Sequence, residues 1–414
     1  MLSWANQFSI SVYLDNNQYH HLSYHRFECL VALNPVDTLP FDRSINALSD
    51  VSDWHSRNSD WLLGHICYDY KNELHPYLSS RQPSHFLFPN IYFFCPEVVC
   101  YIPHGTQQLV IESLQQSPQW VYQQILTQEP FFATDLPQIN FSKKMLKDEY
   151  LRKINRLREH IKEGDCYEIN FCNEGYAENV IIEPVNVFHQ LNKSSPAPFA
   201  AYYRFQDQYM MGSSPERYLY KLGKKIISQP IKGTAKRNFD SELDNKLKQS
   251  LHESVKERAE NVMIVDLTRN DLSRSCETGS VQVEELFGIY SFPTVHQMIS
   301  TISGKLDSCS SLMDSVLYSF PMGSMTGAPK VKVMELINAY ESSKRELFSG
   351  SIGYITPSGD FDFNVVIRSL FYNASTAYLS YQTGGAITFD SDAHLEWEET
   401  ILKASGMEKI FQKH

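Results

Sequence analysis

The sequence contains a lysine in a cramped stretch, Q-P-I-K-G-T, at residues 229–234. Lys232 lies between Ile231 and Gly233, and Pro230 just before them restricts the backbone. A lysine that serves only solubility is better placed on an open helix face, whereas a short, stiff segment can aim an amine. The commoner explanation is an ordinary lysine in a surface loop. The alternative is an amine held for chemistry on a bound molecule.

Two pairs of glutamates have the spacing i, i+3 on predicted helices. Glu257 and Glu260 form one pair, and Glu396 and Glu399 form the other. Carboxylates at this spacing project from neighbouring points of a helix. Mg²⁺ prefers oxygen ligands and often bridges an anionic substrate, so two such helices could converge on one Mg²⁺ ion. By spacing alone, the solvated face of a surface helix is the commoner explanation for each pair.

Three further stretches could hold an anion, and they contain Thr326, Gly327, Arg368, Gly384 and Gly385. The first two residues precede a proline at a predicted helix start, where free N–H groups and the helix dipole attract negative charge. The arginine ends a predicted apolar strand, and its guanidinium could grip a carboxylate with two hydrogen bonds. The glycine pair would let the backbone approach a ligand closely. Each stretch also fits an ordinary structural turn or helix end.

The elements that must position these residues are a mixture of strands and helices. Residues 1–135 carry short aromatic and β-branched runs between turn residues, which predicts a strand-rich half. From residue 142 onward, helices and strands do not alternate strictly, which favours an α+β fold with largely antiparallel sheet. We expect residues 1–135 and 142–414 to form one intertwined domain.

Four helices are predicted in the second part: from Ser142 to Gly164, over 241–270, after Pro329, and from about 395 to the C-terminus. In the second helix, an apolar stripe that includes Val255 and Val262 predicts the buried face, with the glutamates opposite. Strands are predicted between these helices, including one over 363–372.

Composition excludes several classes of function. The net charge of −11 makes the chain a poor candidate for binding nucleic acid, which needs clustered Lys and Arg. No stretch approaches the 18 or so apolar residues of a membrane span, and the N-terminus lacks signal-peptide character. The eight cysteines form no C-x-x-C pair, which is typical of a reduced, cytoplasmic protein.

Taken in order, several motifs resemble one family, the chorismate-utilising enzymes. They are P-I-K-G-T, E-R-A-E-N-V-M-I-V-D-L-T-R-N-D-L, F-P-T-V-H, G-S-M-T-G-A-P-K, V-V-I-R-S and D-A-H-L-E-W-E-E-T. The resemblance covers residues 142–410 strongly and residues 1–135 loosely. It implies a large two-layer α/β sandwich with two antiparallel β-sheets and helices outside. Some relatives bind a regulatory tryptophan in the N-terminal half, and the sequence leaves that open here.

The resemblance also implies roles for individual residues. The four paired glutamates would hold Mg²⁺ against the ring carboxylate of chorismate. Arg368 and Tyr354 would bind the enolpyruvyl carboxylate, with backbone near Gly384 and Gly385 helping. His296 would lie near the reacting ring carbon, or else be a hydrogen-bonded core histidine.

Two positions select a branch of the family. Water-adding members carry a lysine where this sequence has Glu168, and anthranilate synthases have P-I-A-G-T, without Lys232. P-I-K-G-T is typical of the aminodeoxychorismate synthases. The resemblance therefore implies amination of chorismate at C4 through a Lys232 adduct at C2, with Glu216 as general acid. A neutral attacking amine implies a lowered pKa for Lys232.

The implied reaction needs ammonia. No glutaminase nucleophile motif is visible, so we expect a separate glutamine amidotransferase subunit, or ammonium from solution. The alternatives are anthranilate synthase component I and, from another class, a non-catalytic chorismate-binding regulatory subunit.

Overall fold

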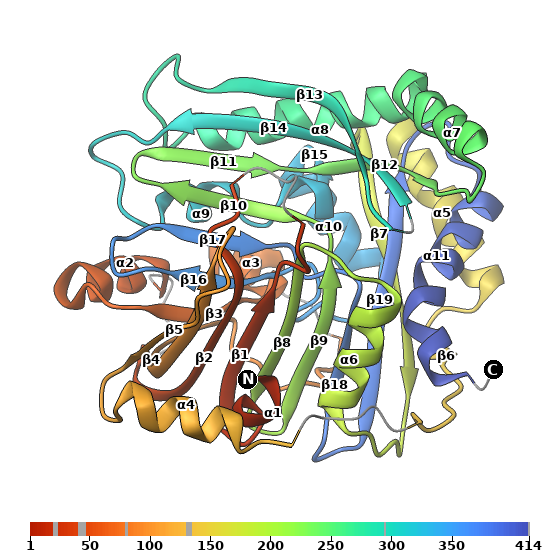
Figure 1. Cartoon of the computed structure of the whole chain (residues 1–414). Helices are drawn as coiled ribbons and strands as arrows, with labels where there is room; N and C mark the ends of the chain where they lie inside the picture. The colour runs from red at the N-terminus through yellow and green to blue at the C-terminus, as the bar shows by residue number, and fades with distance from the viewer. Residues whose placement is uncertain (20–23, 40–46, 79–81, 130–134, 294, 413–414) are drawn as a thin grey trace.

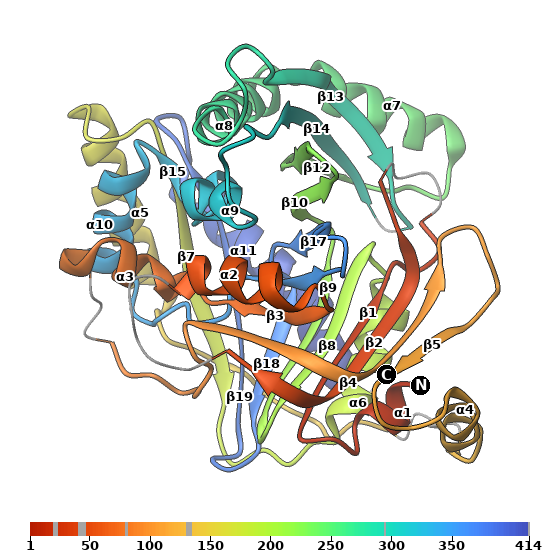
Figure 2. The same ribbon diagram turned by 90° about the vertical axis from the view of Figure 1, so that its left-hand side faces the viewer.

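A computed structural model describes residues 1–19, 24–39, 47–78, 82–129, 135–293 and 295–412. Within these residues, hydrogen bonds join 19 strands into one network in which every strand pair is antiparallel. Helices cover the outside (Figures 1 and 2). The predicted α+β fold with antiparallel sheet is confirmed.

The strands form two layers. One layer contains, in spatial order, β4 (Ile91–Pro103), β2 (Phe27–Thr38), β1 (Ile10–Asp15), β8 (Phe199–Phe205), β9 (Gln208–Ser214), β18 (Ser369–Asn373), β19 (Tyr378–Ile387) and β7 (Glu168–Ala177). The other contains β3 (Leu62–Ile66), β16 (Ser351–Ile355), β17 (Phe361–Asn364), β10 (Arg217–Leu222), β11 (Lys225–Gln229) and β14 (Val295–Lys305), and β14 also pairs with β12 (Ile231–Lys236) and β13 (Gln282–Ser291). Shorter strands extend the first layer: β5 (Val110–Ser113), β6 (Ser142–Lys143) and β15 (Gly327–Ala328).

Strand β4 joins the two layers. Residues 91–94 pair with β3 of one layer, while residues 94–103 pair with β2 of the other. The two sheets expected from the resemblance are therefore one continuous hydrogen-bonded network. Strands from the first 135 residues also pair with later strands, β1 with β8 and β3 with β16.

The helices are α1 (Leu2–Ala5), α2 (Ala47–Asn58), α3 (Lys71–Leu74), α4 (Pro118–Leu126), α5 (Lys147–Lys162), α6 (Pro184–Ser194), α7 (Ser241–Glu253), α8 (Val255–Ser273), α9 (Asp314–Ser319), α10 (Lys330–Tyr340) and α11 (Ala393–Glu408). Four 3₁₀ segments are η1 (Tyr68–Tyr70), η2 (Pro76–Leu78), η3 (Gly323–Met325) and η4 (Lys409–Phe411). Helices α7 and α8 contact β12 and β14, and α11 contacts β19 and α5. Among the described helices, none is both long and apolar enough to cross a membrane.

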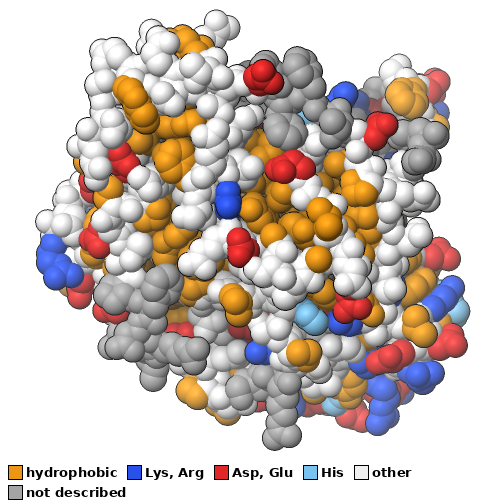
Figure 3. All heavy atoms as spheres, turned by 90° about the horizontal axis from the view of Figure 1, so that it is seen from below, with side chains coloured by type: hydrophobic (Ala, Val, Ile, Leu, Met, Phe, Trp, Pro, Cys, Tyr) orange, Lys and Arg blue, Asp and Glu red, His pale blue; other side chains and the backbone are white. Residues whose placement is uncertain are grey.

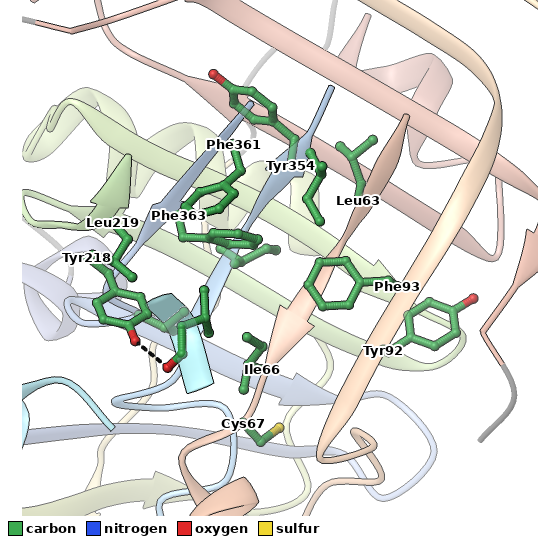
Figure 4. Close-up of a cluster of buried hydrophobic side chains, with 14 of the residues drawn as sticks. Leu63, Ile66, Cys67, Tyr92, Phe93, Tyr218, Leu219, Tyr354, Phe361 and Phe363 are labelled. Carbon is green, nitrogen blue, oxygen red and sulfur yellow. Dashed lines mark hydrogen bonds between the residues drawn. The ribbon is translucent and has the colours of Figure 1, made fainter. Parts of the chain in front are cut away.

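Apolar side chains from both layers meet in a large core. Figure 4 shows part of it, where Phe93 of β4 lies near Phe361 and Phe363 of β17. Tyr218 donates or accepts a hydrogen bond with Ser319 at 2.6 Å, which satisfies its buried hydroxyl. On the surface seen in Figure 3, Lys and Arg side chains are interspersed with Asp and Glu.

Several predicted element bounds are wrong. Ser142 pairs with β7 as part of β6, so α5 begins only at Lys147. The predicted helix over 241–270 breaks at Ser254, whose extended backbone ends α7 and whose hydroxyl caps α8 by accepting from the N–H of Glu257. The strand predicted over 363–372 is interrupted before Ser369 by Arg368, which has φ +53°.

Candidate active site

A cavity of about 650 Å³ opens between β12, α8, α11 and the segment before β18, within the size range of small-molecule sites. Seven of the residues singled out in the sequence line it: Glu216, Lys232, Glu257, Glu260, Arg368, Gly384 and Glu399. They come from segments that are up to 183 residues apart in the chain, from Glu216 to Glu399 (399 − 216 = 183). The fold thus brings most of the predicted site residues together around one cavity.

Lys232 lies on β12 with only 8% of its surface exposed. Its Nζ donates to Oε1 of Glu168 at 2.6 Å. Burial lowers the pKa of this amine, but the charge and hydrogen bond of Glu168 outweigh burial and raise the pKa above its usual value. The expected lowered pKa is therefore wrong in the free protein, because sequence reasoning placed no carboxylate against the amine.

Glu216 lies between β9 and β10 and is 4% exposed. Burial raises its pKa to about 7, although a hydrogen bond with Ser324 and the charge of Lys232 oppose the shift. A carboxyl group with this pKa carries a proton in a substantial fraction of molecules near neutral pH. Its position is therefore suited to a general acid, as the resemblance implied.

Three of the four paired glutamates, Glu257, Glu260 and Glu399, line the cavity, and Glu396 does not. Glu257 and Glu260 project from α8, and Glu396 and Glu399 project from α11. A Cβ on Gly385 would lie 3.0 Å from Oε2 of Glu396, so this glycine leaves room for the carboxylate. Burial raises the pKa of Glu260 to about 7 and also raises those of Glu257 and Glu396.

The predicted orientation of α8 is wrong. Val255 is 83% exposed and Val262 is 39% exposed, whereas Glu260, Asn261 and Ile264 are buried. The glutamates therefore face into the protein and the predicted apolar stripe faces outward. A purely structural helix would gain by burying the valines, so the reversed face indicates a functional constraint.

The carboxylates fit a divalent cation. Among the described residues, Oε1 of Glu260 and Oε2 of Glu396 are buried with no hydrogen-bond partner, although Nζ of Lys256 lies 3.8 Å from the former. Buried oxygens without partners are costly, and a cation would satisfy them. The four glutamates are more widely spread than a closed coordination shell, since the only described group with three candidate ligand atoms within 4.8 Å is His160, Glu163 and Asp165.

Arg368 is another residue that the sequence predicted to bind an anion, and it lines the cavity. Its left-handed backbone, φ +53°, turns the segment before β18 so that its side chain lines the cavity. Burial lowers the pKa of its guanidinium, although Glu399 opposes the shift. No hydrogen bond joins this guanidinium to another described residue, which leaves its donors available for a ligand.

Tyr354 does not line the cavity. It is 6% exposed on β16, with its ring centroid 5.3 Å from that of Phe27, and it borders a separate cavity of about 50 Å³. Figure 4 shows it among core side chains such as Leu63 and Phe361. Phe348 supplies an aromatic ring to the main cavity instead. The structure therefore does not bring Tyr354 to the cavity that Arg368 lines.

His296 also lies outside the cavity wall. Its Nε2 is 3.0 Å from Asp244 and its Nδ1 is 2.9 Å from Ser291, and the side chain is 1% exposed. The neighbours Val295 and Gln297 line the cavity, so strand alternation turns the histidine to the opposite face. Of the two interpretations of His296 given above, the structure favours the second, a hydrogen-bonded core histidine.

The predicted anion site before α10 is displaced by a few residues. Thr326 is fully buried, and Gly327 belongs to β15, which pairs with β7. Ser324 and Met325 line the cavity in their place. The glycine pair at 384–385 lies within β19 rather than at a turn, and a Cβ on Gly384 would lie 2.3 Å from the carbonyl oxygen of Phe171.

Comparisons with known proteins identify the family of this chain. Residues 11–409 match the family described as chorismate binding enzyme. The chain belongs to this family. Aminodeoxychorismate synthase component 1 of Escherichia coli is 38% identical over 291 residues, which are 70% of this chain and 63% of that protein. The protein with the same description in Bacillus subtilis is 30% identical over 363 residues, or 84% of this chain and 76% of the relative.

Solved structures agree on the fold. Anthranilate synthase component I from Streptococcus pneumoniae superposes with a TM-score of 0.81 at 26% identity, covering 93% of this chain and 92% of that one. The menaquinone-specific isochorismate synthase of Escherichia coli, MenF, reaches a TM-score of 0.78 at 19% identity, covering 99% and 91% of the two chains.

This chorismate-binding enzyme also lines its cavity with cations that sequence reasoning missed: Lys236, Arg237, Lys256, Lys403 and Lys409. Lys403 donates to the carbonyl of Gly384 at 2.7 Å and lies 2.6 Å from Glu399, one helical turn away. The i, i+4 spacing of Glu399 and Lys403 in the sequence could have predicted this ion pair. The remaining cations are scattered along the sequence and carry no local pattern.

Proposed function

We propose that this chain aminates chorismate at C4 with ammonia and releases 4-amino-4-deoxychorismate, on the route to p-aminobenzoate and folate. The observation that carries the proposal is Lys232, a buried amine lining the same cavity as Glu216 and the glutamate pairs. The relatives described as aminodeoxychorismate synthase component 1 support it.

In the proposed mechanism, the neutral amine of Lys232 forms a bond to C2 of the ring. The double bonds shift, the C4–O bond breaks, and Glu216 protonates the departing hydroxyl, which leaves as water. Ammonia then forms a bond to C4, the double bonds shift back, and the C2–N bond to Lys232 breaks. Glu216, now a carboxylate, accepts a proton from the new ammonium group. After these two displacements, the new nitrogen on C4 lies on the face of the ring that the C4 hydroxyl occupied.

Glu257, Glu260, Glu396 and Glu399 would hold Mg²⁺ in this proposal. The bound cation would neutralise the ring carboxylate of chorismate and orient it. Arg368 would grip the enolpyruvyl carboxylate. Ammonia would come from a separate glutamine amidotransferase subunit, as the component numbering in the relatives' names suggests, and we propose a cytoplasmic location.

Replacing Arg368 by lysine should raise the KM for chorismate about 10- to 100-fold, because one charge-assisted hydrogen bond is lost while the positive charge remains. The turnover number should fall much less, since the guanidinium does not touch the reacting carbons in this proposal. Steady-state kinetics at saturating Mg²⁺ measure both constants. An unchanged KM would contradict the role assigned to Arg368.

The proposed function is tested by the product of the purified chain supplied with chorismate, Mg²⁺ and ammonium. We expect 4-amino-4-deoxychorismate, which an added aminodeoxychorismate lyase converts to p-aminobenzoate. Accumulation of anthranilate without any added lyase would assign the chain to anthranilate synthesis instead. Chorismate binding without turnover would assign it to a regulatory role.

A further inference from the structure

Glu168 and Lys232 form a buried ion pair. The side chain of Glu168 is fully buried at the first residue of β7, 64 positions before the lysine, and its Oε1 accepts from Nζ at 2.6 Å. Among the described residues, its second oxygen has no hydrogen-bond partner. This oxygen leaves a position on the carboxylate where a proton can bind without breaking a hydrogen bond.

The local fold holds this carboxylate firmly. Strand β15 pairs with the start of β7, and Ala328 lies opposite Glu168. Gly327 approaches so closely that a Cβ there would lie 2.0 Å from the carbonyl oxygen of Glu168, which excludes larger residues. Asn170, two residues further on the same face of β7, lines the cavity. Glu168 is thus held beside the amine, two residues along β7 from the cavity lining.

The proposed function requires a group that removes a proton from Lys232. Lys232 is a cation in the free protein, since Glu168 raises its pKa, and only a neutral amine can attack C2. Other carboxylates facing the amine are Glu216, Glu257, Glu260 and Glu399. The first must remain protonated to release the hydroxyl, and the other three are assigned to the cation. Glu168 is the one described carboxylate in hydrogen-bond contact with the amine.

We propose that Glu168 is the proton acceptor that activates Lys232, an inference that rests on the proposed function. A proton moves from the Lys232 ammonium to Glu168, leaving a neutral amine and a neutral carboxylic acid. The amine then bonds to C2 of the ring. When ammonia has displaced the lysine, the carboxylic acid returns its proton to the free amine. The cycle leaves both side chains in their starting states and needs no other reactant.

The test measures adduct formation directly, using the full chain, chorismate and Mg²⁺ without ammonium. Rapid quenching followed by intact-protein mass spectrometry should show a covalent adduct on the unaltered protein. In Glu168→Gln, the rate of adduct formation should fall about 100-fold, the usual scale of general-base catalysis. Its KM for chorismate should be little changed, since Glu168 does not touch the substrate. Glu168→Asp should restore part of the rate.

A matched control is Glu174→Gln, which alters another buried glutamate on β7. Glu174 accepts from Tyr378 and Ser343 and does not line the cavity. Its replacement should leave the rate of adduct formation unchanged. Thermal melts identify any variant that fails to fold, and in that case Glu168→Asp decides the question by an intermediate rate.

The outcomes separate the two proposals. If the unaltered protein forms neither adduct nor aminated product, the proposed function fails and the role of Glu168 fails with it. If the adduct forms at the same rate in folded Glu168→Gln, only the role of Glu168 is overturned. If the adduct forms normally in that variant but added ammonium discharges it slowly, Glu168 acts on ammonia, which also overturns the inference.

Discussion

Replacement of Lys232 by arginine should reduce amination of chorismate by at least about a thousandfold, a loss on the scale seen when a catalytic nucleophile is removed. Arginine keeps the positive charge beside Glu168, so the buried carboxylate retains a partner and the fold is preserved. The guanidinium stays protonated in proteins and cannot act as a nucleophile. The loss therefore reports the covalent step rather than a broken ion pair.

The measurement is the rate of 4-amino-4-deoxychorismate formation with ammonium, together with the search for an adduct by intact mass. Lys225→Ala serves as the control, since that lysine lies on β11 with its side chain half exposed and pairs with Glu284. Its activity should be unaltered. Normal activity in Lys232→Arg would remove the covalent mechanism, even if the product were the one proposed.

Replacement of Glu260 by glutamine should raise the half-saturating concentration of Mg²⁺ at least about 10- to 100-fold, as expected for a disturbed metal site. The same change should not destabilise the metal-free protein. Because burial raises the pKa of Glu260 to about 7 in the folded chain, its ionised form opposes folding at pH values above its usual pKa, and glutamine removes that charge.

Two measurements check this prediction: the rate as a function of Mg²⁺ concentration, and the rise in melting temperature on adding Mg²⁺. Both should shift in Glu260→Gln, because a cation that binds the native state stabilises it. Glu398→Gln is the control, since Glu398 is exposed beside the second pair. An unchanged response to Mg²⁺ in Glu260→Gln would exclude this glutamate from the cation site.

The sequence predicted which residues line the cavity better than it predicted the contacts around them. The spacing of Glu257 and Glu260 identified a helical pair, yet hydrophobic patterning placed it on the wrong face. Patterning assumes that apolar residues face inward, and it fails where an acidic site faces inward instead. Val255, exposed at the start of α8, shows that conflict directly.

Contacts across the sheet could not be predicted from local pattern. Glu168 and Lys232 meet only because β7, β15 and β12 come together around one cavity, and no spacing rule connects residues 64 positions apart.

His296 and Tyr354 were assigned to the site by motif alone. Alternation along β14, with Val295 and Gln297 facing the cavity, would have turned the histidine away from it.

Gly233 has a consequence for how the two halves of the site are spaced. It directly follows Lys232, and with φ +91° a Cβ there would lie 2.9 Å from Oε2 of Glu257. Gly233 therefore lets the Glu257 carboxylate lie against the backbone directly beside the residue that carries the amine. In the proposed reaction, the ring carboxylate of chorismate is on C1 and Lys232 attacks the neighbouring carbon, C2. A side chain at position 233 would push the glutamate proposed to hold the cation away from the lysine proposed to attack C2.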